Sequence, residues 1–416
     1  VGLVFAGGGA RGAYEAGVMA ELLPELERRD QRPDVIVGTS VGAINAAYLA
    51  SVAHLSAGEA VAGLVERWED LSPGRVIRPI VGLQTTLAGL RYLGDVLALP
   101  GVELRSFLDA SPLAGTLDEW LDWQRLHRNV SEGLLDAAAV VATSALSAHS
   151  IVFVEGRERG RLSRSHEIEY VPARLTRDQV RASAAIPTLF EAIRVEEPRE
   201  AAGWYFDGGT RLNTPIKPAI DLGVDRVIVI GTHSVSPVSR SNWHEEGSPP
   251  DFGDGAVQLL FAALVDSLIE DVRMLGKINL VVGEHGPPAA SRRYKERRGK
   301  RPYRRMPYMF IAPRSRDAVG DVAARVFHEH YGGLRGLRSP DIAAAGRLLG
   351  GISEPHAELL SYLLFSAEFA RELIELGRSD ARAWLERDWG PDGPWLTDPV
   401  EALEEQATSE HRPGSA

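Results

Sequence analysis

The segment VGLVFAGGGARG, residues 1–12, decides the fold class of this protein. Its first five residues form an apolar run, and three consecutive glycines follow shortly after it. A short apolar run closed by glycines predicts a buried strand followed by a tight turn. Apolar residues at helical spacing over Ala13–Arg29 then predict a helix.

The same order of elements recurs immediately downstream. An apolar run over Val35–Val37 predicts a second buried strand, residues 38–42 a second glycine turn, and Ala43–Ser51 a second helix. Two successive strand–turn–helix units indicate an α/β fold with a mainly parallel central sheet. Further strands are predicted at Ala139–Thr143, Ile151–Val154, Trp204–Phe206, Val227–Ile230, Leu280–Val282 and Met309–Ala312, with a helix over Val257–Leu275.

The pattern becomes helical after Asp317. Helices are predicted at Ala318–His330, Asp341–Leu349 and His356–Leu376, whereas residues 234–254 and 284–307 are predicted to be loops. We therefore divide the chain into an α/β domain over 1–316, a helical extension over 317–390 that packs on it, and a polar, disordered tail over 391–416.

Bulk composition narrows the class of protein. Of the 416 residues, 44% are hydrophobic and 25% charged, as in globular proteins. The formal net charge of −11, from 46 basic and 57 acidic side chains, makes nucleic acid a poor candidate partner. The absence of cysteine excludes disulfides, thiolate metal sites and a cysteine nucleophile. No run approaches about 20 apolar residues, so no membrane-spanning helix is expected.

The compartment is predicted from the same features. A chain without cysteine suits a reducing compartment, and no basic leader precedes the first apolar run. We therefore expect a cytoplasmic protein. Val1 is not Met and already belongs to the predicted first strand, so residues could precede it, and with them a targeting signal.

The stretch GTSVG, residues 38–42, matches the pattern G-x-S-x-G between a predicted strand and a predicted helix. A nucleophilic serine in this context sits on a sharp turn that exposes its Oγ. The flanking glycines remove Cβ clashes from the turn, and the helix N-terminus favours developing negative charge. The plain alternative is a turn in which Ser40 only caps the helix. The strand before it and the helix after it favour a nucleophile.

The first glycine turn has two interpretations. Residues 7–12 fit G-x-G-x-x-G, the fingerprint of dinucleotide binding, but that fold needs an acidic side chain where the second strand ends. This sequence has Gly38-Thr39-Ser40 there, so the dinucleotide interpretation fails. Consecutive glycines can instead present backbone N–H groups to an oxyanion. Because parallel strands end at one edge of a sheet, we expect both glycine turns to face one substrate carbonyl.

A serine nucleophile needs a proton acceptor, and two residues are candidates. His233 follows the predicted strand Val227–Ile230 and completes the Ser–Asp–His order of α/β-hydrolases, although only one strand precedes Ser40. Asp207 ends another predicted strand and is followed by two glycines. A carboxylate takes the serine proton directly if burial raises its pKa. The plain alternative for Asp207 is a turn residue.

The three motifs together resemble the patatin-like phospholipases. They are GGGARG at 7–12, GTSVG at 38–42 and DGG at 207–209, in that order. The stretches AAIP at 184–187 and NTP at 213–215 also resemble segments on either side of the aspartate in that family. The resemblance covers about residues 1–235. It implies a three-layer α/β/α fold, and the C-terminal helices resemble an extension found in some bacterial members.

The resemblance also implies an activity and a set of residues. It implies a serine acyl hydrolase that cleaves fatty-acyl esters of phospholipids, lysophospholipids or neutral glycerolipids through a covalent acyl-enzyme, with no metal and no cofactor. Ser40 is then the nucleophile and Asp207 the proton acceptor. The implied oxyanion hole comprises Gly7, Gly8, Gly9 and Arg11, and the other motif glycines are Gly12, Gly38, Gly42, Gly208 and Gly209. A Ser-His-Asp esterase and a catalytically silent lipid-binding protein on the same fold remain the alternatives.

The segment Arg292–Arg305 is strongly basic, with nine Lys or Arg residues against Glu296 alone. A solvated loop is one interpretation. The other is peripheral contact with anionic membrane lipids, where each basic residue near the surface contributes about 1 kcal/mol. Tyr294 and Tyr303 would suit such an interface.

Overall fold

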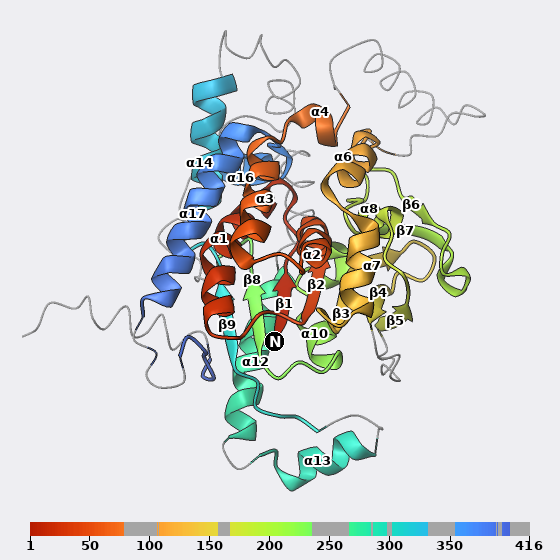
Figure 1. Ribbon diagram of the computed structural model, residues 1–416, viewed down its shortest axis with the longest axis vertical. Coiled ribbons are helices and arrows are strands. Elements are labelled where there is room, and N and C mark those ends of the chain that lie inside the picture. The colour runs from red at the N-terminus through yellow and green to blue at the C-terminus, as the bar shows by residue number, and fades with distance from the viewer. Residues whose placement is uncertain are drawn as a thin grey trace, which may run out of the picture.

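The computed structural model describes residues 1–78, 106, 108–156, 167–234, 266–283, 286–297, 302–331, 354–387, 389 and 393–399. Within these residues, nine strands form one sheet, and seven of them follow the order β5-β4-β3-β2-β1-β8-β9. The other two strands branch from this path, with β7 paired to β3 and β6 paired to β7. Figure 1 shows the sheet enclosed by helices.

The centre of the sheet is parallel. β1 (Gly2–Phe5) lies between β2 (Val35–Thr39) and β8 (Val227–Ile230), and β9 (Tyr308–Ile311) lies beyond β8. Every residue of these four strands is buried, as expected for parallel strands covered on both faces. Their carboxyl ends emerge at one edge of the sheet, which gathers the turns after β1, β2 and β8.

The other half of the sheet is mixed. β3 (Ala137–Ser144) runs parallel to β2, whereas β4 (Ser150–Gly156) and β7 (Gly203–Asp207) run antiparallel to β3. The outer strands are β5 (Ile168–Pro172) and β6 (Ile193–Val195). In this register Thr39 pairs with Val141, and Asp207 pairs with Ala142, one residue further along β3. The end of β7 is therefore brought beside the residue that follows β2.

Helices cover both faces of the sheet. α1 (Gly12–Arg28) and α2 (Val41–Ser51) belong to connections that step from β1 to β2 to β3. The connection from β8 to β9, which contains α12 (Asp266–Val282), steps the opposite way. Because such crossovers are right-handed, α1 and α2 lie on one face of the sheet and α12 lies on the other. The predicted α/β fold with a mainly parallel central sheet is thus confirmed. The other α-helices described between residues 57 and 221 are α3 (Ala57–Glu69), α4 (Pro73–Val76), α6 (Pro112–Trp120), α7 (Trp123–Ser131), α8 (Arg177–Ser183), α9 (Gly209–Leu212) and α10 (Ile216–Asp221).

The C-terminal helices pack on this core, as Figure 1 shows for α17 beside α1. Those that the structure describes are α14 (Ala318–Val326), a π-helical turn (Phe327–Tyr331), α16 (Glu354–Leu363) and α17 (Ala367–Leu385). A Cβ at Gly17 or Gly377 would overlap the backbone of the facing helix, so these glycines allow α1 and α17 to touch. Further on, Leu396 forms a bridge to Tyr308 of β9. The domain boundaries at 316 and 390 stay a prediction.

Several sequence-based expectations were wrong in detail. Leu280–Val282 is not a strand but the last turn of α12, where Leu280 and Val281 are exposed. The predicted loop over 284–307 contains a helix, α13 (Ala289–Glu296). The predicted helix His356–Leu376 is divided into α16 and α17, because the Ser366 side chain accepts a hydrogen bond from the Phe369 amide and begins a new helix.

Other expectations fall on residues that the structure does not describe. They include the helix Asp341–Leu349, the first part of the helix Val257–Leu275, nearly all of the loop 234–254 and residues 400–416 of the tail. Among the described residues, no helix is both long enough and apolar enough to cross a membrane.

Candidate active site

Ser40 occupies a strained turn between β2 and α2. Its backbone angles are φ 55° and ψ −127°, a region that non-glycine residues rarely adopt. A Cβ at Gly38 would overlap the carbonyl of Gly42, and a Cβ at Gly42 would lie 2.5 Å from the carbonyl oxygen of Ala6. Only glycine fits either position, so the G-x-S-x-G spacing follows from the close packing of this turn.

The backbone of Ser40 is held by a residue that the sequence did not single out. The Ser40 amide donates a hydrogen bond to Ser183 Oγ at 2.8 Å, and Ser183 Oγ donates to the Val141 carbonyl at 2.5 Å. Ser183 lies in α8 and is buried. Ser183 directly precedes the AAIP stretch, but its role in fixing the turn depends on the packing of α8 against β3.

Asp207 lies within hydrogen-bonding distance of Ser40. Ser40 Oγ donates to Asp207 Oδ2 at 2.6 Å, and the Gly209 amide donates to Oδ1 at 2.6 Å. The Asp207 side chain is completely buried. Burial raises the pKa of Asp207 to about 7, and the hydrogen bonds from Ser40 and Gly209 oppose that rise. A carboxylate with this pKa can accept a proton near neutral pH.

The AAIP stretch supports the turn at Asp207. The Asp207 amide donates to the Ala185 carbonyl at 2.8 Å, and the Gly208 amide donates to the Ser183 carbonyl at 3.2 Å. A Cβ at Gly208 would overlap the Val141 carbonyl of β3. The D-G-G sequence therefore lets the chain turn directly against the sheet while the Asp207 carboxylate points to Ser40.

The glycine turn after β1 runs beside Ser40. A Cβ built at Gly7 would lie 3.1 Å from Ser40 Cβ and would overlap the Asn213 side chain. Gly7 was expected to be an oxyanion donor, but its amide already donates to the Asn213 carbonyl at 3.1 Å. Among the described residues, the amides of Gly8 and Gly9 have no such partner. They are the donors that this turn can offer to a substrate.

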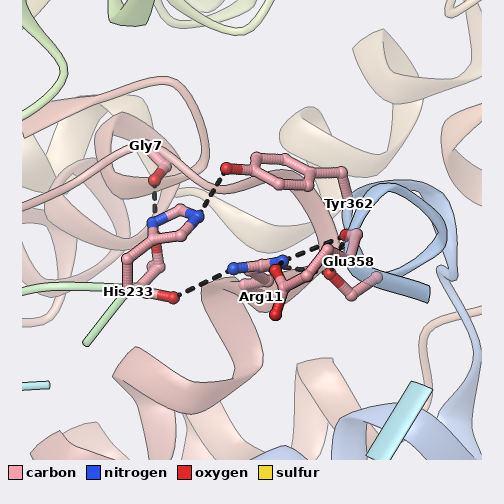
Figure 2. A network of polar contacts seen from close by, with 7 residues as sticks. Gly7, Arg11, His233, Glu358 and Tyr362 are labelled. Atoms are coloured by element: carbon pink, nitrogen blue, oxygen red, sulfur yellow. Dashed lines mark hydrogen bonds and ion pairs between the residues drawn. The ribbon is translucent and has the colours of Figure 1, made fainter. Parts of the chain in front are cut away.

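Arg11 was expected to line the oxyanion hole, and its amide and its guanidinium are both bound to other groups of the protein. Its amide donates to the Gly8 carbonyl at 3.2 Å, and its buried guanidinium points to the C-terminal helix α16. There it forms an ion pair with Glu358, donates to Ser361 Oγ at 2.7 Å and lies over the Tyr362 ring. Figure 2 shows this arrangement. The partners lie about 350 residues away in the sequence, so no local signal predicts them.

His233 is not arranged as the third member of a triad. Its Nδ1 lies 3.1 Å from Thr232 Oγ1 and its Nε2 lies 2.6 Å from the Tyr362 hydroxyl, so both ring nitrogens are occupied. Asp207 contacts Ser40 directly. Burial, followed by the positive charges of Arg11 and Arg316, lowers the pKa of His233 well below its usual value. The ring is therefore neutral at physiological pH.

An apolar pocket opens at Ser40. The empty space within it amounts to about 560 Å³, which includes space open to solvent. Ser40 and Gly9 lie in its wall, and nearly all of the other lining residues are apolar. These others are Val41, Ile44, Trp68, Leu71, Val76, Leu113, Thr116, Leu117, Trp120, Ala184, Ile186, Phe190 and Phe365.

Comparison with known proteins identifies the family of this chain. Residues 3–220, more than half of the chain, match the family model described as "Patatin-like phospholipase". No curated protein matches the sequence. Among solved structures, the crystal structure of VipD from Legionella pneumophila is similar at 16% identity, with a TM-score of 0.31. That match covers 75% of this chain and 61% of the VipD chain.

Proposed function

The chain belongs to the patatin-like phospholipase family, and on this basis we propose that it is a lipid acyl hydrolase in which Ser40 is the nucleophile and Asp207 the general base. Membership of the family implies acyl hydrolysis. The assignment of the two residues is supported by one observation above all, the 2.6 Å hydrogen bond from Ser40 Oγ to Asp207 Oδ2 beside an apolar pocket.

The proposed reaction has two steps. Asp207 accepts the proton of Ser40 as Oγ attacks the ester carbonyl, and the Gly8 and Gly9 amides hold the resulting oxyanion. The protonated Asp207 then gives its proton to the departing alcohol, which leaves an acyl-enzyme. Asp207 next takes a proton from water, which attacks the acyl carbonyl, and the fatty acid leaves as Ser40 recovers its proton. Losing one oxyanion donor costs about 3 kcal/mol of transition-state stabilisation in comparable sites.

We propose that the substrates are fatty-acyl esters of phospholipids or lysophospholipids, because the pocket at Ser40 is lined by aliphatic and aromatic side chains. Each methylene transferred from water into such a pocket contributes about 0.8 kcal/mol. Purified protein would be incubated with mixed phospholipids, lysophospholipids and acylglycerols, and the products identified by mass spectrometry. Release of fatty acid only from a non-lipid ester would count against the lipid assignment.

The test of the dyad is hydrolysis of a p-nitrophenyl acyl ester. Ser40→Ala and Asp207→Asn should each reduce the rate at least about 1,000-fold, because nucleophile and base act as a unit. Circular dichroism should show that both variants remain folded. Wild-type activity in either variant would refute the dyad, and inactive wild-type protein that still binds lipid would favour the silent lipid-binding alternative.

The Ser-His-Asp alternative is separated by His233→Ala. A triad predicts a loss as large as that of Ser40→Ala. The dyad predicts that His233 affects the rate only through Thr232, whose hydroxyl donates to the Gly7 carbonyl of the glycine turn. We expect His233→Ala to lose about tenfold, far less than removal of a catalytic residue.

For the basic segment Arg292–Arg305 we propose a membrane tether that is separate from catalysis. Within this segment, Arg304 pairs with Asp225, just before β8 begins. Figure 1 shows α13 beyond this end of the sheet, where the strands start, whereas Ser40 lies where β2 ends. A membrane held here would not itself present lipid to Ser40.

The tether is tested with the triple variant Arg292→Gln, Arg293→Gln and Lys295→Gln. Its binding to vesicles with anionic lipid should fall, while its hydrolysis of a water-soluble ester stays unchanged. Unaltered vesicle binding would contradict the tether and favour the alternative that this segment is only solvated.

A further inference from the structure

The glycine turn that supplies the oxyanion donors is joined to the C-terminal helix α16 by the buried guanidinium of Arg11. Besides its ion pair with Glu358, Arg11 donates through Nη2 to the Glu358 carbonyl at 3.0 Å and through Nη1 to the Thr232 carbonyl at 3.3 Å. It thus connects three segments, namely the turn after β1, the turn after β8 and α16 (Figure 2). All of its side-chain partners lie beyond residue 220, outside the part that matches the family model.

A second connection runs through four groups in a fixed hydrogen-bond direction. Thr232 Oγ1 donates to the Gly7 carbonyl at 2.7 Å, so it accepts from His233 Nδ1. His233 carries one ring proton because its pKa is lowered, so its Nε2 accepts from the Tyr362 hydroxyl. Tyr362 therefore fixes the histidine tautomer, and the histidine fixes the hydroxyl that holds the carbonyl of Gly7.

The backbone of α16 also limits where the turn can lie. Gly9 has φ 58°, and a Cβ there would overlap the carbonyl of Tyr362. Shortly after α16 ends, Phe365 lines the pocket at Ser40 together with Gly9. The proposed oxyanion donors, Gly8 and Gly9, are thus bordered by Arg11 and Gly7, both anchored to α16, and by the α16 backbone itself.

We propose that Glu358 and Tyr362 of α16 are positioning residues for the oxyanion donors, so that the C-terminal helical segment is a working part of the active site. This inference rests on the proposed function. Glu358 acts through Arg11, and Tyr362 acts through His233 and Thr232. If either connection is removed, the turn keeps its sequence but loses the geometry that aims two amides at the developing negative charge.

The variants Glu358→Gln and Tyr362→Phe test this inference in the full-length protein. Gln keeps the size of the side chain and removes its charge, and Phe keeps the ring over Arg11 while removing the hydroxyl. Two matched controls alter contacts elsewhere among the C-terminal helices. Glu372→Gln breaks an exposed ion pair with Arg325, and Tyr331→Phe removes a hydroxyl bonded to Glu368.

The readout is the split between kcat and KM on a p-nitrophenyl acyl ester, with kcat divided by the number of serines that a fluorophosphonate labels at its end point. Misplaced oxyanion donors affect the transition state more than substrate binding. We therefore expect Glu358→Gln and Tyr362→Phe to lower kcat per labelled serine about tenfold or more, with KM within about twofold of wild type. Both controls should keep wild-type values.

Two results would overturn the inference. One is a wild-type kcat per labelled serine in both α16 variants. The other is a loss shared equally by the controls, since that would indicate general destabilisation of the helices. Ser40→Ala separates this outcome from failure of the proposed function. If Ser40→Ala is inactive while Glu358→Gln is fully active, the dyad stands and only the role of α16 fails.

Discussion

The Asp207→Asn variant should be more stable than the wild type by an amount that increases with pH. The carboxyl group is fully buried, and burial raises its pKa from 3.8 to about 7. Between these two values the unfolded chain has lost the proton and the folded chain still holds it. The folded state therefore binds more protons, and the stability of the wild type falls as the pH rises through this window. Asn does not titrate, so the variant escapes this loss.

The size of the effect follows from the two pKa values. Linkage predicts that the raised pKa of Asp207 lowers the unfolding free energy of the wild type by about 1.5 kcal/mol at pH 5 and by about 4 kcal/mol at pH 8. The difference in unfolding free energy between variant and wild type should thus grow by about 2.5 kcal/mol between these pH values. Constant effects of the substitution, such as an altered hydrogen bond to Ser40, cancel in this comparison.

The assay is urea unfolding followed by circular dichroism at several pH values from 5 to 8. Asp225→Asn is the control, because that carboxylate is exposed and pairs only at the surface. A stability gap for Asp207→Asn that stays constant over this range would show that the carboxylate is not desolvated, and the reasoning about the base would fail.

Three further predictions concern rate, packing and specificity. kcat/KM for ester hydrolysis should rise with pH and level off above about pH 7, because only deprotonated Asp207 accepts the serine proton; a rate independent of pH from 5.5 to 8.5 would contradict this. Gly208→Ala should unfold the turn and abolish activity, because its Cβ overlaps the Val141 carbonyl. The measurement is the amount of soluble protein that a fluorophosphonate labels, and full activity would show that the turn is looser than described. Leu113→Trp should fill part of the pocket and lower kcat/KM about tenfold more for long acyl esters than for acetyl esters; an unchanged preference would place the acyl chain elsewhere.

The local parts of the site could be predicted from the sequence. The strand, glycine turn and helix around Ser40 are encoded within about twenty residues. Each glycine of this turn is required because a Cβ there would overlap neighbouring backbone atoms. The parallel core followed for the same reason, because apolar runs such as Val227–Ile230 are buried on both faces. Contact between Ser40 and Asp207 was expected from motif order, and the strand register brings the two residues together.

The distant parts could not be predicted. The interaction of Arg11 with Glu358 joins residues 347 positions apart, and neither lies in a motif that indicates the other. Leu280–Val282 was mistaken for a strand because a run of three apolar residues is too short to distinguish helical from strand periodicity. Only the preceding turns of α12 identify these residues as helical. Ser183, which holds the Ser40 amide, directly precedes the AAIP stretch, but its contact with Ser40 depends on how α8 packs against β3.

The most direct test of the dyad is the rate and site of fluorophosphonate labelling in wild type and in Asp207→Asn, followed by mass spectrometry of the labelled peptides. The Ser40–Asp207 hydrogen bond predicts a single label on Ser40 in the wild type, formed at least about 100-fold more slowly in Asp207→Asn. A label on any other serine, or equal labelling rates in the two proteins, would contradict it.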